Sequence, residues 1–150
     1  MTATAHALIG GAIAAATTSN PALGITLAAL SHPILDFIPH WDFGAGWRQK
    51  KKIHLFLQAS ADLAFGTIVT FMLFGQSTNP IYLLICILVS LSWDIMQAPY
   101  WLLGWNFFPF STFYKVQHEI NRKAKLPWGV LTQAVTVTGV VLALRTIPIH

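Results

Sequence analysis

Long apolar stretches separated by short polar breaks dominate this chain. Five stretches hold few charged residues, and breakers such as Ser19-Asn20-Pro21 separate them. They cover residues 2–18, 22–38, 53–75, 80–103 and 128–147. A soluble domain of this size could not bury so many apolar side chains in one core, so such runs indicate transmembrane helices. The pattern predicts an all-α, polytopic membrane helix bundle with about five hydrophobic segments and four to five spans.

Residues 111–125 follow a different pattern. Apolar Phe113, Tyr114 and Val116 stand beside basic Lys115 and Arg122. A helix with one apolar and one basic side is typical of a segment that lies on anionic lipid headgroups. We therefore expect one interfacial amphipathic helix between the fourth and fifth segments, although a solvated connector would show a similar bias.

Composition agrees with a membrane protein. The chain is 55% hydrophobic and 9% charged, whereas about 25% charged is usual for soluble domains. We expect residues 1–150 to form a single integral membrane domain. The one cysteine, Cys86, lies in an apolar run, so an internal disulfide framework and a cysteine zinc cluster are both excluded.

Basic residues predict the orientation of the chain. Of the 9 Lys and Arg residues, all but Arg145 lie in residues 48–52 or 115–125. With five spans these two stretches fall on the same side, which the positive-inside rule places in the cytoplasm together with the N-terminus. We expect a multi-pass protein of the cell (inner) membrane. Because this rule already explains the pI of about 9.5, we expect no nucleic-acid partner.

Histidines and aspartates cluster near the predicted cytoplasmic end of the second segment. His32, Asp36 and His40 recur at steps of four, so a helix would place them on one face. His6 begins the first segment on the same side. Imidazole and carboxylate groups are common ligands of zinc and related metals. The sequence predicts a divalent metal site, most suited to Zn²⁺, held by His6, His32, Asp36 and His40.

Two further aspartates lie inside apolar segments. An ionised carboxylate at the centre of a membrane helix costs about 2.5–3.5 kcal/mol, so Asp62 and Asp94 each need a partner or a function. Both fall in the cytoplasmic half, and we expect them to be catalytic, one of them as general base. A proton-sharing pair is the alternative. Possible further site residues are Asp42, His54 and His118, although the two histidines could simply be interfacial.

The motifs near the N-terminus also resemble a known family. Thr4-Ala5-His6-Ala7-Leu8, Ser31-His32-Pro33-Ile34-Leu35-Asp36 and Pro39-His40-Trp41-Asp42 are similar to motifs of small bacterial and archaeal inner-membrane proteins classed as membrane-bound metal-dependent hydrolases. The resemblance covers the first 42 residues. The His-Arg-Gly-x-Thr-His-Ser motif of many relatives is missing, and Ile53-His54-Leu55 is the nearest segment to it. The resemblance implies a multi-helix membrane protein with hydrolase activity.

These observations lead to one expected function and two alternatives. We expect a membrane-embedded metal-dependent hydrolase that attacks a lipid or lipid-linked ester, amide or phosphoester with a metal-activated water. A site at the depth of the lipid headgroups favours such a substrate. We expect the protein to be embedded in the bilayer. A transporter that moves protons or cations through Asp62 and Asp94 is one alternative. A non-catalytic protein whose helices are stapled by a metal is the other.

Overall fold

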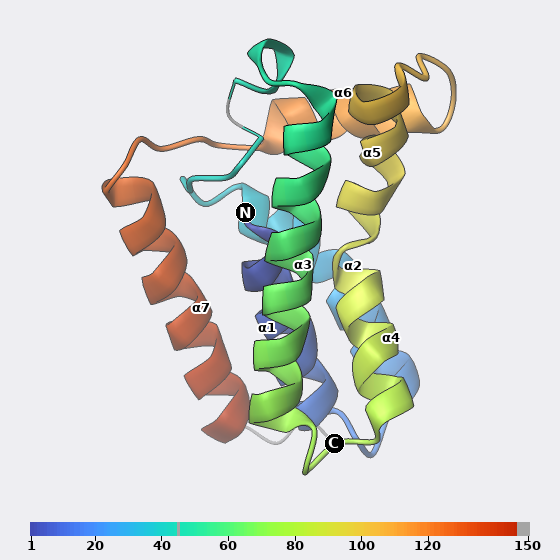
Figure 1. The fold of residues 1–150 in the computed structure, drawn as a ribbon. Helices are drawn as coiled ribbons and strands as arrows, with labels where there is room; N and C mark the ends of the chain where they lie inside the picture. The colour runs from blue at the N-terminus through green and yellow to red at the C-terminus, as the bar shows by residue number, and fades with distance from the viewer. Residues whose placement is uncertain (45, 147–150) are drawn as a thin grey trace.

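The computed structural model describes residues 1–44 and 46–146. These residues form seven α-helices and a 3-10 helix, and the predicted all-α fold is confirmed (Figure 1). The elements are α1 (Ala3–Ala16), α2 (Pro21–Asp36), η1 (Trp47–Gln49), α3 (Lys52–Phe74), α4 (Pro80–Ser90), α5 (Ser92–Leu103), α6 (Phe110–Ile120) and α7 (Trp128–Thr146).

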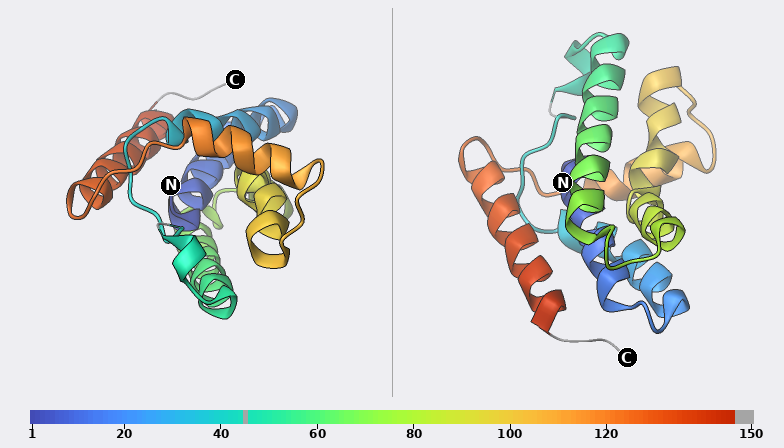
Figure 2. Two further views of the ribbon diagram at one scale, coloured as in Figure 1. Left: turned by 90° about the horizontal axis from the view of Figure 1, so that it is seen from above. Right: turned by 60° about the horizontal axis from the view of Figure 1, so that its bottom comes forward.

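Helix α1 lies at the centre of the bundle. It contacts α2, α3, α4 and α7, and seen from the α6 end it lies inside the other helices (Figure 2). Its sequence explains this position, because small alanine and glycine side chains let neighbouring backbones come close on all sides. His6 is buried there with the surrounding alanines.

Two glycines of α1 allow the closest approaches. A Cβ atom on Gly10 would lie 2.7 Å from the Ser90 hydroxyl and 2.8 Å from the Cys86 carbonyl oxygen of α4. A Cβ atom on Gly11 would collide with Thr70 of α3. Gly10 and Gly11 therefore allow α4 and α3 to pack closely against α1.

The number of candidate spans is smaller than predicted. Within the described residues, α3 and α7 are long and apolar enough to cross a membrane. Helices α4 and α5 pass the same criterion together, but a bend of 51° separates them, so the total is two or three. Helix α1 has 14 residues and α2 has 16, which at 1.5 Å per residue gives roughly 21 and 24 Å, short of a hydrocarbon core of about 30 Å. The last residue of the fifth predicted segment, Ile147, lies outside the described residues.

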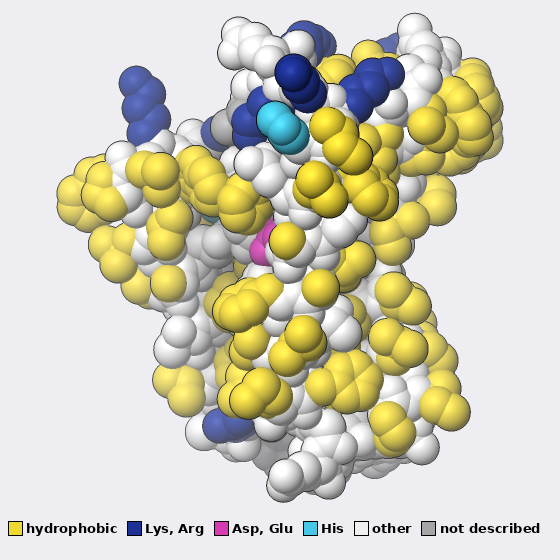
Figure 3. Space-filling view, in the orientation of Figure 1, with side chains coloured by type: hydrophobic (Ala, Val, Ile, Leu, Met, Phe, Trp, Pro, Cys, Tyr) yellow, Lys and Arg dark blue, Asp and Glu magenta, His cyan; other side chains and the backbone are white. Residues whose placement is uncertain are grey.

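The outer surface of the bundle is apolar. Large hydrophobic side chains on α3, α4 and α7 are highly exposed, including Phe65, Met72, Ile81 and Val135, and such side chains cover much of the face in Figure 3. A soluble protein rarely exposes an apolar surface this extensive. The exposed apolar surface is compatible with a membrane protein.

Helix α6 crosses one end of the bundle (Figure 1). It ends at Ile120, five residues before the predicted end of the amphipathic helix, because the following backbone turns to pair with the chain after α2. There the His40 amide donates to the Arg122 carbonyl at 3.0 Å, and the Ala124 amide donates to the His40 carbonyl at 2.8 Å. Most of the Lys and Arg side chains visible in Figure 3 gather at this end.

The helix contacts of Gly10 lead to a prediction for stability. Gly10→Ala should lower the free energy of unfolding by about 1–3 kcal/mol, because the added methyl group overpacks the contact with Cys86 and Ser90. Gly139→Ala on α7 is the matched control, since nothing lies within 4 Å of its Cβ position; it should be neutral or slightly stabilising. Thermal unfolding in detergent measures both. Equal midpoints for the two variants would contradict the assigned packing.

Candidate metal centre

The predicted ligands from α1 and α2 meet in the interior of the bundle. His32 and Asp36 lie one helical turn apart on the face of α2 that meets α1, and their side chains are fully buried. Across the contact, the rings of His6 and His32 stack with centroids 3.7 Å apart and planes within 6°. His6, His32 and Asp36 can each place a ligand atom within 4.8 Å of the others, close enough to hold a metal ion.

The carboxylate of Asp36 is the centre of this group. His6 Nε2 lies 3.4 Å from Asp36 Oδ1, His32 Nε2 lies 3.5 Å from Oδ2, and His40 Nε2 lies 3.7 Å from Oδ1. Ligand atoms that share a tetrahedral zinc ion at about 2.0–2.1 Å stand about 3.3–3.4 Å apart. The spacing therefore suits a divalent metal, and three imidazoles approach the carboxylate through the same nitrogen.

Backbone carbonyls hold two of these imidazoles. His32 Nδ1 lies 2.6 Å from the Ser90 carbonyl oxygen, and His40 Nδ1 lies 2.8 Å from the Ile38 carbonyl oxygen. A carbonyl can only accept, so Nδ1 carries the proton and the neutral ring keeps a lone pair on Nε2. Metal-binding histidines are commonly oriented by this kind of hydrogen bond.

The bend between α4 and α5 supplies the carbonyl that holds His32. Ser90 is the last residue of α4, where carbonyl groups lose their partners within the helix. Its single hydroxyl proton is shared between the His6 carbonyl at 2.9 Å and the Ile87 carbonyl of α4 at 2.8 Å. One residue therefore connects α4 to both the α1 and the α2 side of the site.

Several ring nitrogens in the site are buried and unpaired. Both ring nitrogens of His6 and the Nε2 of His40 have no hydrogen-bond partner among residues 1–44 and 46–146. A buried polar atom without a partner costs about 1–3 kcal/mol. A metal ion beside Asp36 would use the Nε2 lone pairs of His6 and His40, so the residues fit the cation that the sequence predicts.

A positive group already contacts Asp36 in the structure. The amino group of Met1 makes an ion pair with Asp36 Oδ1, and both groups are fully buried. This contact balances the charge of a carboxylate that would otherwise be costly to bury. A metal ion bound at Asp36 Oδ1 would take the place of this amino group.

Gln117 of α6 is a site residue that the sequence interpretation missed. Its Nε2 lies 3.1 Å from Asp36 Oδ2, 3.1 Å from Asp94 Oδ1 and 3.2 Å from His32 Nε2. An amide nitrogen has two hydrogens, so it can serve two of these three acceptors at once. A signal was present in the sequence, because Gln117 follows Phe110, Phe113 and Tyr114 at helical spacing and therefore interrupts the apolar face of α6.

Asp94 lies at the edge of the metal centre. Its Oδ1 is 3.7 Å from His32 Nε2, and its side chain is 32% exposed. Gln97 also donates to Asp94 Oδ1, at 2.8 Å. Asp94 therefore lies between the buried His32 and the adjoining cavity, which it lines.

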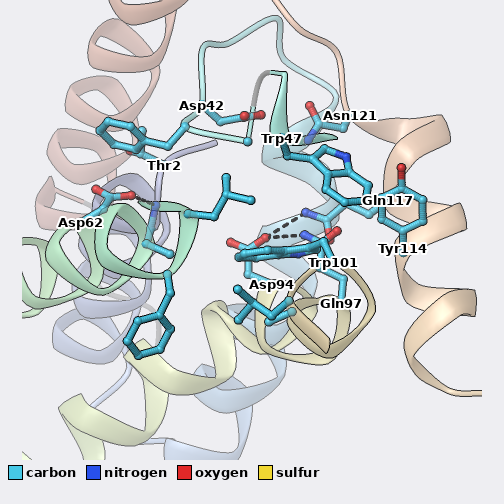
Figure 4. Close-up of a pocket in the computed structure, with 18 of the residues that line it drawn as sticks. Thr2, Asp42, Trp47, Asp62, Asp94, Gln97, Trp101, Tyr114, Gln117 and Asn121 are labelled. Atoms are coloured by element: carbon cyan, nitrogen blue, oxygen red, sulfur yellow. Dashed lines mark hydrogen bonds between the residues drawn. The ribbon is translucent and has the colours of Figure 1, made fainter. Parts of the chain in front are cut away.

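Asp62 has different partners from Asp94. It accepts hydrogen bonds from the backbone amides of Ala3 and Thr4 and from the Thr4 hydroxyl, at 2.6, 3.3 and 2.6 Å. These groups form the first turn of α1, whose unpaired amides and positive dipole end favour a carboxylate. Figure 4 shows Asp62 and Asp94 on opposite sides of a cavity. The structure gives Asp62 a capping position, and the catalytic role expected for it stays a prediction.

The three further candidates occupy separate positions. Asp42 Oδ2 lies 3.7 Å from His40 Nε2 and 3.4 Å from Lys123 Nζ. Burial alone would raise the pKa of Asp42, but the neighbouring His40 and Lys123 lower it to about 2. His54 is exposed on α3. His118 stacks on Tyr114 with centroids 5.8 Å apart, and neither of these two histidines belongs to the group around Asp36.

A cavity of about 580 Å³ adjoins the metal centre. Asp94 and Gln117 form part of its wall, and the rest is mainly apolar and aromatic, with Trp47, Trp101 and Tyr114 among the lining residues (Figure 4). Arg48 and Lys123 also line the cavity. A pocket that is mostly apolar with a few polar groups at one side is typical of a small-molecule site.

Comparisons with protein-family models, curated proteins and solved structures find no match to this chain.

Metal content provides the direct test of the centre. The purified protein, stripped and reloaded with zinc, should hold about one ion per chain by mass spectrometry. Asp36→Asn and His32→Gln should each reduce this content at least tenfold, since each removes a ligand while keeping a similar volume. His54→Gln, an exposed change on α3, should retain the ion. Full occupancy in folded Asp36→Asn protein would refute the site.

The position of Asp62 predicts a separate effect. Asp62→Ala should lower the free energy of unfolding by about 1–2 kcal/mol, because the first turn of α1 loses its carboxylate acceptor. Bound zinc should remain at the level of the unchanged protein, which elemental analysis of the same samples can measure. Loss of zinc without loss of stability would instead place Asp62 in the metal centre.

Proposed function

We propose that this protein is a membrane-embedded, metal-dependent hydrolase that acts on a lipid or lipid-linked ester, amide or phosphoester. The observation that carries the proposal is the convergence of three imidazole Nε2 atoms on buried Asp36, beside a cavity that reaches Asp94. His6, His32 and Asp36 would hold the ion, and His40 would complete the set. Histidine and carboxylate ligands favour zinc among the common divalent metals.

The proposed chemistry assigns a task to each neighbouring side chain. Bound zinc would lower the pKa of a coordinated water to near 7 and polarise the bond to be broken. Asp94 is the residue we assign as general base, because its carboxylate lies 3.7 Å from His32 Nε2 and reaches the cavity. Gln117 is a positioning residue, because its one amide group donates to both Asp36 and Asp94 and fixes the two carboxylates relative to each other.

The proposed location follows from the distribution of charge and apolar surface. Basic residues at the α6 end support a cytoplasmic position for that end and for the adjacent metal centre. Helices α3, α7 and the bent pair α4–α5 are the candidate spans. The short α1 would lie at membrane depth inside them, and α2 would lie at the same depth against α1 and α4 with Leu30 and Ile34 exposed. These features agree with the resemblance to membrane-bound metal-dependent hydrolases.

A metal-stapled protein without activity is the second candidate. The side chains of His6, His32, Asp36 and His40 have no exposed surface, which is usual for a structural site. The partly exposed Asp94 and the adjoining cavity favour the hydrolase. The transporter alternative has weaker support, since both Asp62 carboxylate oxygens accept hydrogen bonds from α1.

Hydrolysis of a defined panel tests the proposal. Zinc-loaded protein in vesicles should cleave at least one member of a panel of phospholipids, lipid esters and lipid amides, as measured by mass spectrometry of the products. A chelator should abolish cleavage and added zinc should restore it. Asp94→Asn should lower kcat about 10²–10⁴-fold while the zinc content stays constant.

His54→Gln serves as the control, because its side chain is exposed on α3, away from the metal centre. It should keep the activity of the unchanged protein. Zinc-loaded protein that cleaves no member of the panel would favour the stapled alternative, and unchanged activity in Asp94→Asn would remove Asp94 as the base.

A further inference from the structure

A second hollow lies on the outside of the bundle between α3 and α5. This groove has a volume of about 550 Å³, and its wall is almost wholly apolar. Its lining residues are Lys52, Ile53, Phe56, Ile95, Ala98, Pro99, Leu102 and Leu103. Several of these side chains, including Ile53 and Leu103, are highly exposed, so the groove faces whatever surrounds the protein.

The outer groove and the inner cavity share a wall. Phe56, Ile95, Ala98 and Leu102 line both spaces. These four side chains come from α3 and α5, which make few contacts with each other. The wall between the outer groove and the cavity beside Asp94 is therefore formed by these side chains alone. The helices α3 and α5 do not pack closely against each other at this wall.

We propose that the gap between α3 and α5 is a lateral portal through which a membrane phospholipid with an anionic headgroup enters the cavity. One acyl chain would lie in the groove against Ile53, Phe56 and Leu102. Movement of Phe56 and Leu102 side chains would join the groove to the cavity. The groove thus selects an acyl chain, and the cavity receives the polar part of the same lipid.

Two basic side chains, one at the groove and one at the cavity, favour a lipid with an anionic headgroup. Lys52 stands at the groove where α3 begins, and Arg48 lines the cavity nearby. Arg48 lies over the Trp47 ring, 5.1 Å from its centroid, and donates to the Tyr114 hydroxyl at 3.3 Å. Asp42, Asp62 and Asp94 also line the cavity. Asp42 is paired with Lys123, Asp62 accepts from the start of α1, and Asp94 accepts from Gln97 and Gln117, so within the described residues none of them forms an ion pair with Arg48. A phosphate group would find both cations near the mouth.

This inference deepens the proposed function, because it names the substrate class of the same site, yet it can be tested without catalysis. The probe is phosphatidylglycerol with a diazirine in one acyl chain, incorporated into vesicles with the whole protein. After irradiation, peptide mass spectrometry should find the label on α3 and α5 residues of the groove. Ala98→Trp should reduce this label at least fivefold, since the larger side chain fills the shared wall.

Ala143→Trp is the matched control, because Ala143 is exposed on α7 and lines neither space. It should keep the label on α3 and α5. Lys52→Gln should reduce the preference for phosphatidylglycerol over the same probe with a phosphatidylcholine headgroup several-fold. Thermal unfolding, measured for every sample, confirms that each variant is folded.

Two results would overturn the portal. One is a label spread evenly over the outer faces of α3, α5 and α7; the other is a groove label that Ala98→Trp leaves unchanged. Equal labelling by both headgroups would refute the anionic preference. A normal label in protein that hydrolyses nothing would refute the hydrolase alone, whereas hydrolysis without a groove label would refute the portal alone.

Discussion

The buried carboxylate of Asp36 is the constraint on which the site depends. A carboxylate with no exposed surface must be matched by positive charge or by hydrogen-bond donors. The partners of Asp36 come from four segments of the chain. His6 belongs to α1, His32 to α2, His40 to the loop after α2, and Gln117 to α6. The fold brings these segments together because α1 is narrow enough to occupy the centre of the bundle.

The packing of α1 and the chemistry of the site are therefore linked. Gly10 places α4 against α1, and that contact positions Ser90, whose carbonyl holds His32. On the other side, Asp62 of α3 accepts the first amides of α1 and fixes the level at which His6 lies. Asp62 therefore has a structural role in positioning α1, whether or not it also has the catalytic role that the sequence predicts.

Much of the site could be predicted from the sequence, for identifiable reasons. His32 and Asp36 share a helical face, so local spacing was sufficient, and His6 followed from the topology. Gln117 was missed because its partners lie far from it in the chain: Asp94 is 23, Asp36 is 81 and His32 is 85 residues away. The bend after Ser90 was also missed, because the hydropathy of residues 80–103 indicates one continuous segment despite Asp94 and Gln97. Helix lengths explain the excess of predicted spans, since hydropathy alone does not show where α1 and α2 end.

The bend between α4 and α5 has a consequence for how the protein could evolve or be redesigned. The same break leaves the Ser90 carbonyl free for His32 and directs α5 along a new axis, where it borders the groove with α3. The orientation of His32 and the groove between α3 and α5 therefore share one structural cause. A straight helix in this position would use the Ser90 carbonyl in its own hydrogen bonds and would also move α5 away from its place beside α3. A substitution that straightens the bend should therefore change the orientation of His32 and the shape of the groove together.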